Sequence, residues 1–252
     1  MTVKEALYTY VVRIADDSLI LGQRLAEWCG HGPILEEDIA LTNISLDLIG
    51  QATNLFQYAV ILEDKGRTED QLAFLRVDRE YSNLLLVEQP NKDFGYTIAR
   101  QFYFDAFRKL FFEALTNSED TQLAAIAEKS LKETKYHLKH SSEWIIRLGD
   151  GTEESHQRIQ DAINFNWRFT HELFFQNEVD KTLIELGIGL DLATLFDDWK
   201  NYVSNVLQQA TLELPSHSFK LEGGRNGMHS EHLGYLLAEM QYMQRAFPNL
   251  TW

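Results

Sequence analysis

Most of this sequence can only fold as helix, because apolar residues recur at helical spacing over long stretches that almost lack helix-breaking residues. The longest stretch, residues 34–65, contains no proline and a single glycine, Gly50. Residues 4–28 place apolar side chains at steps of three, four and seven, which is the spacing of one helix face. The chain of 252 residues holds only 14 glycines and 4 prolines, a share well below the roughly 12% of average proteins. We therefore predict an all-α protein.

The same spacing predicts a series of helices within one domain that spans residues 1–252. The expected ranges are 4–28, 34–65, 69–80, 93–116, 119–148, 153–176, 178–186, 191–212 and 229–246. Residues 82–93 predict an irregular connection around Pro90, and residues 213–228 predict the longest loop. Residues 34–65 are apolar on nearly every side, so we expect that helix to be central.

The charge and cysteine content exclude several classes of protein. The chain has 23 basic and 38 acidic residues and a net charge of −15, which disfavours nucleic acid or an anionic membrane as the main partner. Its one cysteine, Cys29, rules out an intrachain disulfide. The first residues do not resemble a signal peptide, and no apolar run is long enough to cross a bilayer. We expect a cytoplasmic protein.

A line of polar positions runs along the otherwise apolar helix expected over residues 34–65. Its members are Asn43, Asp47, Gly50, Asn54 and Gln57. Their steps of four and three residues place them on one face of a helix. Because buried polar groups are normally hydrogen-bonded, we expect a hydrogen-bonded seam in the core.

The helix expected over 119–148 carries a comparable inward line. It comprises Ser130, Thr134, His137 and Ser141 between Leu123, Ile126 and Ile145, whereas Lys132, Lys135, Lys139 and Glu143 point away. On the preceding helix, Asp105 shares a face with Ile98 and Phe102. A carboxyl group buried among apolar neighbours needs a cation or hydrogen-bond donors, and Arg108 lies one turn further on.

These polar residues repeat with the same spacing in the two halves of the chain. Asp47 follows Ser18 by 29 residues, and Thr134 follows Asp105 by 29. Ferritin-like dimetal proteins place Glu on two helices and Glu-x-x-His on two others. The six equivalent positions here are Ser18, Asp47, Gly50, Asp105, Thr134 and His137. They hold too few carboxylates and imidazoles for a pair of irons, so we predict a degenerate site in a ferritin-like four-helix bundle with extra C-terminal helices. A register that uses Glu133 with His137 ranks second.

The end of the expected loop holds three glycines, and a histidine pair follows it directly. His229 and His232 flank Ser230 and Glu231. This arrangement predicts a helix cap or a surface arrangement, and a metal site that uses both histidines is the weaker alternative. Gly223, Gly224 and Gly227 predict a flexible loop, although such a loop is also able to approach an anion.

Several segments resemble a known family. RLAEWCGHGP (24–33), LTNISLDLIGQATNL (41–55), SNLLLVEQP (82–90), KETKYHLKHS (132–141) and GMHSEHLGYLLAEMQYMQRAFP (227–248) are similar to the structural subunits of bacterial ring-1,2-phenylacetyl-CoA epoxidases. These are multicomponent monooxygenases of aerobic phenylacetate degradation. The resemblance runs from about residue 7 to Trp252.

The resemblance implies a division of labour. The catalytic subunit of the family carries the di-iron site, and the present type is its ferritin-like paralogue without cofactor. The two form a stable hetero-oligomer, a reductase supplies electrons from NADPH, and a small further subunit also joins the complex. Oxygen is then activated at the irons of the partner, and the phenyl ring of the CoA thioester becomes an epoxide.

The resemblance also implies that this paralogue contacts the CoA thioester at the subunit interface. The candidate residues are Arg79, Glu80, Tyr81 and Ser82, with Asp180, Lys181 and Thr182. Arg79 and Lys181 are suited to phosphates and Tyr81 to stacking. The alternative is that both segments are solvated helix surface.

Three functions remain open from the sequence. The first is a non-catalytic scaffold that stabilises and orients a di-iron partner. The second is a self-sufficient ferritin-like oxygenase that uses Asp47, Asp105, Glu133 and His137. The third is a helical binding module with no enzyme partner. The shortage of metal ligands favours the scaffold.

Overall fold

The computed structural model describes residues 1–216, 219–248 and 250, and in these residues it is helical without any strand. The all-α prediction is therefore confirmed. The chain divides into two compact units, residues 1–90 with 223–252 and residues 91–222. The single domain expected over residues 1–252 stays a prediction. No helix of the described residues is both long enough and apolar enough to cross a membrane.

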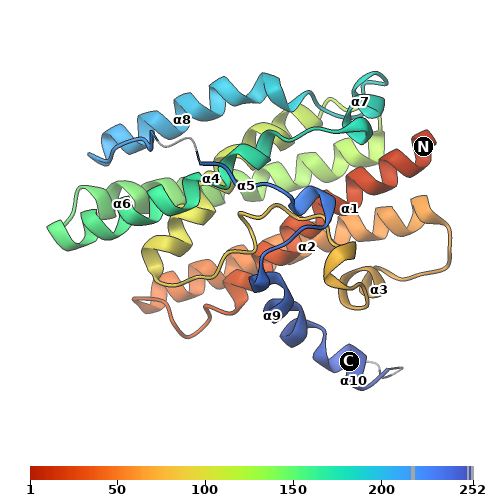
Figure 1. Ribbon diagram of the computed structural model, residues 1–252, viewed down its shortest axis with the longest axis horizontal. Helices are drawn as coiled ribbons and strands as arrows, with labels where there is room; N and C mark the ends of the chain where they lie inside the picture. Colours follow the sequence, from red (N-terminus) through yellow and green to blue (C-terminus); the bar gives the residue numbers. More distant parts are fainter. Residues whose placement is uncertain (217–218, 249, 251–252) are drawn as a thin grey trace. The chain divides into compact units, whose positions relative to one another are not determined.

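The first unit is built on a hairpin of two long helices, α1 (Val3–Ala26) and α2 (Leu35–Glu63), which pack along their length (Figure 1). A capping box between Thr2 and Glu5 starts α1. Shorter elements complete the unit: α3 (Glu69–Phe74), η1 (Asp78–Glu80), η4 (Gly224–Asn226), α9 (Glu231–Met240) and α10 (Tyr242–Ala246). The segment around Pro90 is irregular, as predicted.

The second unit is built on another long hairpin, α4 (Phe94–Leu115) and α5 (Thr121–Gly149). Asp93 and Asp120 cap the starts of these two helices. The remaining elements are α6 (Glu153–Trp167), η2 (Thr170–Phe174), α7 (Glu178–Ile184), η3 (Leu192–Leu195) and α8 (Phe196–Gln209). The expected loop 213–228 contains η4, and its residues 217–218 lie outside the described residues.

Two long helical hairpins in an all-helical chain are consistent with the ferritin-like class. The helix expected over 153–176 ends earlier, at Trp167, and the one expected over 69–80 ends at Phe74. In both cases a short 3₁₀ turn follows, and apolar periodicity does not separate such a turn from the preceding helix.

The prediction that residues 34–65 form a central helix is wrong. One side of α2 is buried, but Ile39, Leu46 and Ile61 are 52%, 61% and 72% exposed. These residues lie on one face together with Leu35, which is also exposed. We call Leu35, Ile39, Leu46 and Ile61 the outer α2 face. The sequence does not distinguish an apolar face that is buried within the chain from one left open to solvent.

The core of the second unit is strongly aromatic. Trp199 of α8 stacks on Trp167 of α6 at a centroid distance of 5.8 Å, and its indole N–H donates to the carbonyl oxygen of Tyr103, 3.2 Å away. Phe174 meets the Trp199 ring edge-on. Because buried aromatic rings contribute large apolar contact areas, this cluster fixes α6 and α8 against α4.

Candidate functional site

The α4–α5 hairpin buries a polar cluster around Asp105. One carboxylate oxygen accepts a hydrogen bond from the Gln101 side-chain amide at 2.6 Å, and the other accepts one from the Ser141 hydroxyl at 2.9 Å. Burial raises the pKa of Asp105 to about 7, although His137, Ser141, Gln101 and Arg108 each act to lower it. The sequence correctly placed Asp105 among apolar neighbours and predicted its need for donors.

The inward line predicted for residues 119–148 is confirmed. Ser130, Thr134, His137 and Ser141 of α5 are all buried, while Lys132, Lys135, Lys139 and Glu143 are exposed. The Thr134 hydroxyl donates to the main-chain carbonyl oxygen of Ser130 at 2.9 Å, within its own helix. Glu133, from the alternative register, is half-buried beside this line.

The corresponding line on α2 does not form the predicted buried seam. Asn43 and Gln57 are exposed, and Asp47 and Asn54 are half-buried. A side chain added at Gly50 would meet no described atom within 4 Å. The seam prediction is therefore wrong, because the line lies towards the open side of α2. On α1, the Ser18 hydroxyl is buried and donates to the carbonyl oxygen of Ile14 at 3.3 Å.

The residues at the six positions do not fit a pair of irons. Ser18 and Thr134 carry neutral hydroxyls that bond their own helices, and Gly50 has no side chain at all. Among the described residues, no three His, Cys, Asp or Glu side chains gather in a way that could hold a metal ion. The convergence of all six positions on one point stays a prediction.

The structure places the first group of expected thioester contacts on and after η1. Arg79 and Glu80 are exposed, whereas Tyr81 is buried. The Tyr81 hydroxyl donates to the carbonyl oxygen of Ala73, and the Arg76 guanidinium lies 4.1 Å from the centre of its ring. This ring is therefore not open to a stacking ligand in this conformation. Arg79 and Glu80 of η1 are the members of this group that lie on the solvent-exposed surface.

Arg79 lines a cavity of about 630 Å³ in the first unit. The other lining residues are Asp78, Asn226, Gly227, Met228, His229 and Ser230. The cavity thus joins η1 to the segment that precedes α9.

The second group of expected contacts lies in α7 of the other unit. Asp180 is buried, and its carboxylate accepts from the main-chain N–H of Asn177 at 2.8 Å, which caps the helix. Lys181 is exposed and pairs with Glu178 at 2.7 Å. The Thr182 hydroxyl donates to the carbonyl oxygen of Glu178 at 2.9 Å. Lys181 is thus the member of this group that is open to a charged ligand.

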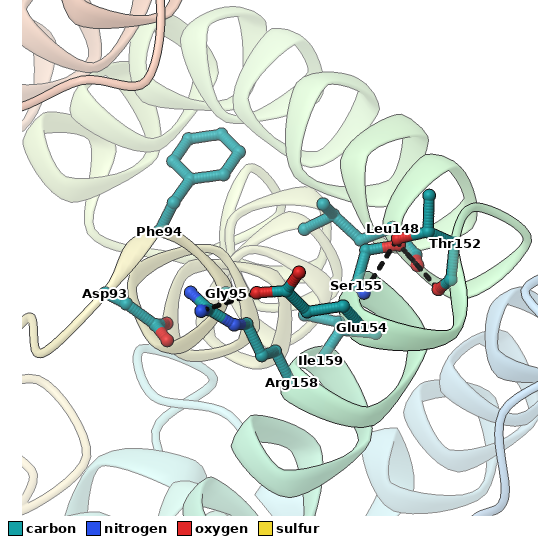
Figure 2. Close-up of a pocket in the computed structure, with 9 residues that line it drawn as sticks. All are labelled: Asp93, Phe94, Gly95, Leu148, Thr152, Glu154, Ser155, Arg158 and Ile159. Atoms are coloured by element: carbon teal, nitrogen blue, oxygen red, sulfur yellow. Dashed lines mark hydrogen bonds and ion pairs between the residues drawn. The ribbon is translucent and has the colours of Figure 1, made fainter.

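A smaller cavity, of about 280 Å³, lies in the second unit where α4 and α6 begin and α5 ends (Figure 2). Arg158 and Glu154 form an ion pair of 2.7 Å at its edge. Thr152 caps α6 by accepting from the Ser155 N–H at 3.1 Å. The polar groups here serve helix capping and a surface ion pair, and no predicted site residue lines the cavity.

The sequence did not reveal a network of buried charges in the first unit. Asp16 of α1 pairs with Arg76, and Asp17 pairs with Arg225 at 2.8 and 3.0 Å. Glu88 pairs with His229 at 2.8 Å. The signal was present as two adjacent acids within the apolar pattern of residues 4–28, but their partners lie 60 and 208 residues away along the chain.

The structure places the glycines and the histidine pair noted in the sequence at η4 and the start of α9. A Cβ on Gly224 would overlap the carbonyl oxygen of Asn83, and Gly227 similarly approaches the Arg79 backbone. These glycines are therefore required for close packing, and the prediction of a loose loop is wrong at this point. Of the two arrangements predicted for the histidine pair, the structure favours the helix cap, because Ser230 between the histidines is the N-cap of α9 and the His229 side chain is only 4% exposed.

Comparisons with known proteins give a consistent result. Residues 2–252 match the family model described as "Phenylacetic acid catabolic protein". The chain is also 51% identical over 246 residues to one of the subunits of the 1,2-phenylacetyl-CoA epoxidase of Escherichia coli strain K12. The matched region covers 98% of this chain and 99% of that protein.

Proposed function

Because the chain belongs to the phenylacetic acid catabolic protein family, we propose that it is a structural subunit of a 1,2-phenylacetyl-CoA epoxidase complex. The observation that carries this proposal is the 51% identity, over 98% of the chain, to a subunit of the Escherichia coli epoxidase. Similarity of this extent along the whole chain supports the same place in the same kind of complex. The chain would then act in phenylacetate catabolism, in the cytoplasm.

In this proposal the chain is a scaffold and carries no cofactor. The neutral hydroxyls of Ser18 and Thr134 and the missing side chain at Gly50 support it, since a bridged iron pair needs more anionic ligands. The di-iron site belongs to the catalytic paralogue, NADPH serves a reductase subunit, and a small accessory subunit belongs to the same complex, as the resemblance implies. We do not propose a self-sufficient oxygenase. Glu133 would add only one carboxylate to those of Asp47 and Asp105, which is still too few for a pair of irons.

The outer α2 face is the surface that we propose for the catalytic subunit. Large apolar side chains that share one exposed helix face mark interaction sites more often than isolated ones do. Leu35, Ile39, Leu46 and Ile61 are all exposed along a helix of 29 residues. Homologous helical subunits pack well through such faces, because burial of apolar area drives association.

Charged substitutions on the outer α2 face are expected to release the catalytic subunit. In Ile39→Glu/Leu46→Glu, two carboxylates would be desolvated on binding, so the yield of co-purified partner should fall at least about tenfold. Tagged chain would be co-expressed with the catalytic subunit and the pulled-down partner quantified. Leu186→Glu, at a comparably exposed apolar residue of the second unit, is the matched control.

The outcomes separate the two levels of this proposal. Undiminished co-purification of the double variant would contradict the docking face alone. Failure of the unaltered chain to co-purify with the catalytic subunit would contradict the scaffold function and favour a binding module without an enzyme partner.

We also propose that Arg79 contacts a phosphate of the CoA thioester in the assembled complex. Its exposed guanidinium lines the cavity of about 630 Å³, and a guanidinium is well suited to bidentate contact with phosphate. The net charge of −15 supports the view that a partner holds most of the thioester. Lys181 is the second candidate, on the other unit.

Removal of the Arg79 side chain tests this contact. Arg79→Ala is expected to weaken phenylacetyl-CoA binding by the assembled complex about tenfold or more, because the charge-assisted contact with the phosphate is lost. Calorimetry on the purified complex measures the change. Arg158→Ala, which removes an exposed arginine of the second unit, should leave affinity unchanged. An equal affinity for Arg79→Ala and the unaltered complex contradicts the contact.

A further inference from the structure

The start of α9 is fastened by a carboxylate from another part of the chain. Glu88, fully buried, accepts hydrogen bonds from the Ser230 N–H at 2.6 Å and from Asn83 at 3.0 Å. Ser230 is the N-cap residue of α9, and its own side chain does not cap the helix. Glu88 therefore supplies the negative charge that a helix start favours.

The same carboxylate binds the His229 ring in an arrangement that requires two protons. Nδ1 of His229 lies 2.8 Å from the Glu88 carboxylate, and Nε2 lies 3.0 Å from the carbonyl oxygen of Tyr81. Both oxygens are acceptors, so only the doubly protonated imidazolium donates to both. A neutral ring would direct a lone pair at one of these oxygens inside a buried site.

From this geometry we infer that His229 is a proton-dependent clasp, which fastens α9 and α10 to residues 81–88 at low pH and loosens as pH rises. α9 packs on α1 and η1, and α10 follows directly after α9 (Figure 1). Other contacts also hold this segment: the Arg24 guanidinium donates to the carbonyl oxygen of His232 at 2.8 Å, and the Gln241 amide donates to the carbonyl oxygen of Arg76 at 2.9 Å. Opening of the clasp would thus loosen α9 first at its start, where Glu88 and His229 hold it.

The charged groups around the His229 ring also favour its protonated form. Burial lowers the pKa of His229, but the hydrogen bond and charge of Glu88 outweigh it, with smaller help from the Tyr81 carbonyl and from Asp16 of α1, so the net pKa is raised. The other charged groups nearby are occupied elsewhere or exposed. Arg76 and Arg225 pair with Asp16 and Asp17, Arg24 bonds the Glu88 main chain, and Asp78 and Arg79 line the adjoining cavity.

The sign of the pH dependence follows from this raised pKa. A histidine bound more tightly as the cation contributes its full stabilisation below the ordinary pKa of 6.5. That contribution is lost as pH rises through the raised value. α9 should therefore be held best in mildly acidic solution.

Hydrogen exchange of the full chain between pH 6 and pH 9 tests the clasp. The intrinsic exchange rate of each amide would be divided by its observed rate to give protection factors for residues 231–246. In the unaltered chain these should fall on the order of tenfold or more across the range, because a hydrogen bond to a charged group is worth roughly ten- to hundredfold. His229→Gln should show low protection that does not change with pH. His232→Gln, three residues on, is the matched control.

Two results would overturn the inference. One is protection in residues 231–246 that stays constant with pH in the unaltered chain, and the other is an unchanged pH dependence in His229→Gln. A second variant guards against misfolding of the first. Glu88→Gln removes the neighbouring charge, so its loss of protection should begin at lower pH than in the unaltered chain, and an unshifted midpoint contradicts the clasp. Nitrogen-15 NMR of the His229 ring should show both nitrogens protonated at pH 6.

Discussion

Arg225→Ala is expected to lower the free energy of unfolding by about 3–5 kcal/mol, because it removes the guanidinium that contacts both oxygens of a buried carboxylate. Asp17 is fully buried, and the guanidinium of Arg225 contacts both of its oxygens at 2.8 and 3.0 Å. Arg225 also donates to the carbonyl oxygen of Ser82 at 2.8 Å. Urea denaturation followed by circular dichroism measures the loss.

Three further variants show whether charge is the cause. Arg158→Ala removes an exposed ion pair and should cost less than about 1 kcal/mol. Arg225→Lys keeps the charge but not the two-pronged contact, so its loss should be intermediate. Asp17→Asn in the Arg225→Ala background should restore part of the stability, since a neutral amide costs less to bury than a carboxylate. A loss for Arg225→Ala no larger than for Arg158→Ala contradicts the argument.

Asp105→Asn is expected to stabilise the protein at pH 8 by on the order of 2 kcal/mol. The pKa of Asp105 rises from 3.8 to about 7 on folding, chiefly through burial. The folded state therefore binds the proton more tightly, and stability falls as pH rises from about 4 to about 7. At 1.36 kcal/mol per pKa unit, the upper bound of this cost is about 4 kcal/mol. The gain in stability expected for Asp105→Asn is smaller than this bound, because the asparagine amide accepts fewer hydrogen bonds than the carboxyl group.

The advantage of Asp105→Asn should shrink as pH falls. At pH 5 the buried carboxyl group is already protonated, so the two proteins should differ by less than about 1 kcal/mol. Denaturation at several pH values measures the difference. Asp161→Asn, at an exposed residue of α6, is the control and should show no such trend. A difference between Asp105→Asn and the unaltered chain that does not grow with pH contradicts the assigned burial cost.

The helical hairpins could be predicted because their signals are local. Helical spacing of apolar residues and the near absence of breakers gave α1, α2, α4 and α5 within a few residues. The Asp105 environment was also predictable, because Gln101 lies on the same helix and Ser141 on the next, with both residues on inward faces. The shorter helices were predicted less well. The range 191–212 begins as the 3₁₀ turn η3 before α8, and the range 229–246 is divided into α9 and α10.

The faces of α2 could not be predicted in the same way. The apolar pattern of this helix gives no sign of which side meets α1, since residues on both sides are apolar. Ile44 is buried and Leu46 is exposed, although both are large and aliphatic. An apolar face that awaits a partner subunit and one buried within the chain have the same composition.

The sequence by itself determined the all-α class, the two long hairpins and the shortage of metal ligands, because each depends on residue type and spacing along one helix. Only the tertiary structure decided which buried charges pair. Asp17 with Arg225 and Glu88 with His229 are 208 and 141 residues apart. Such pairs form because folding buries oppositely charged groups next to each other, away from water. This proximity leaves no periodic signal in the sequence.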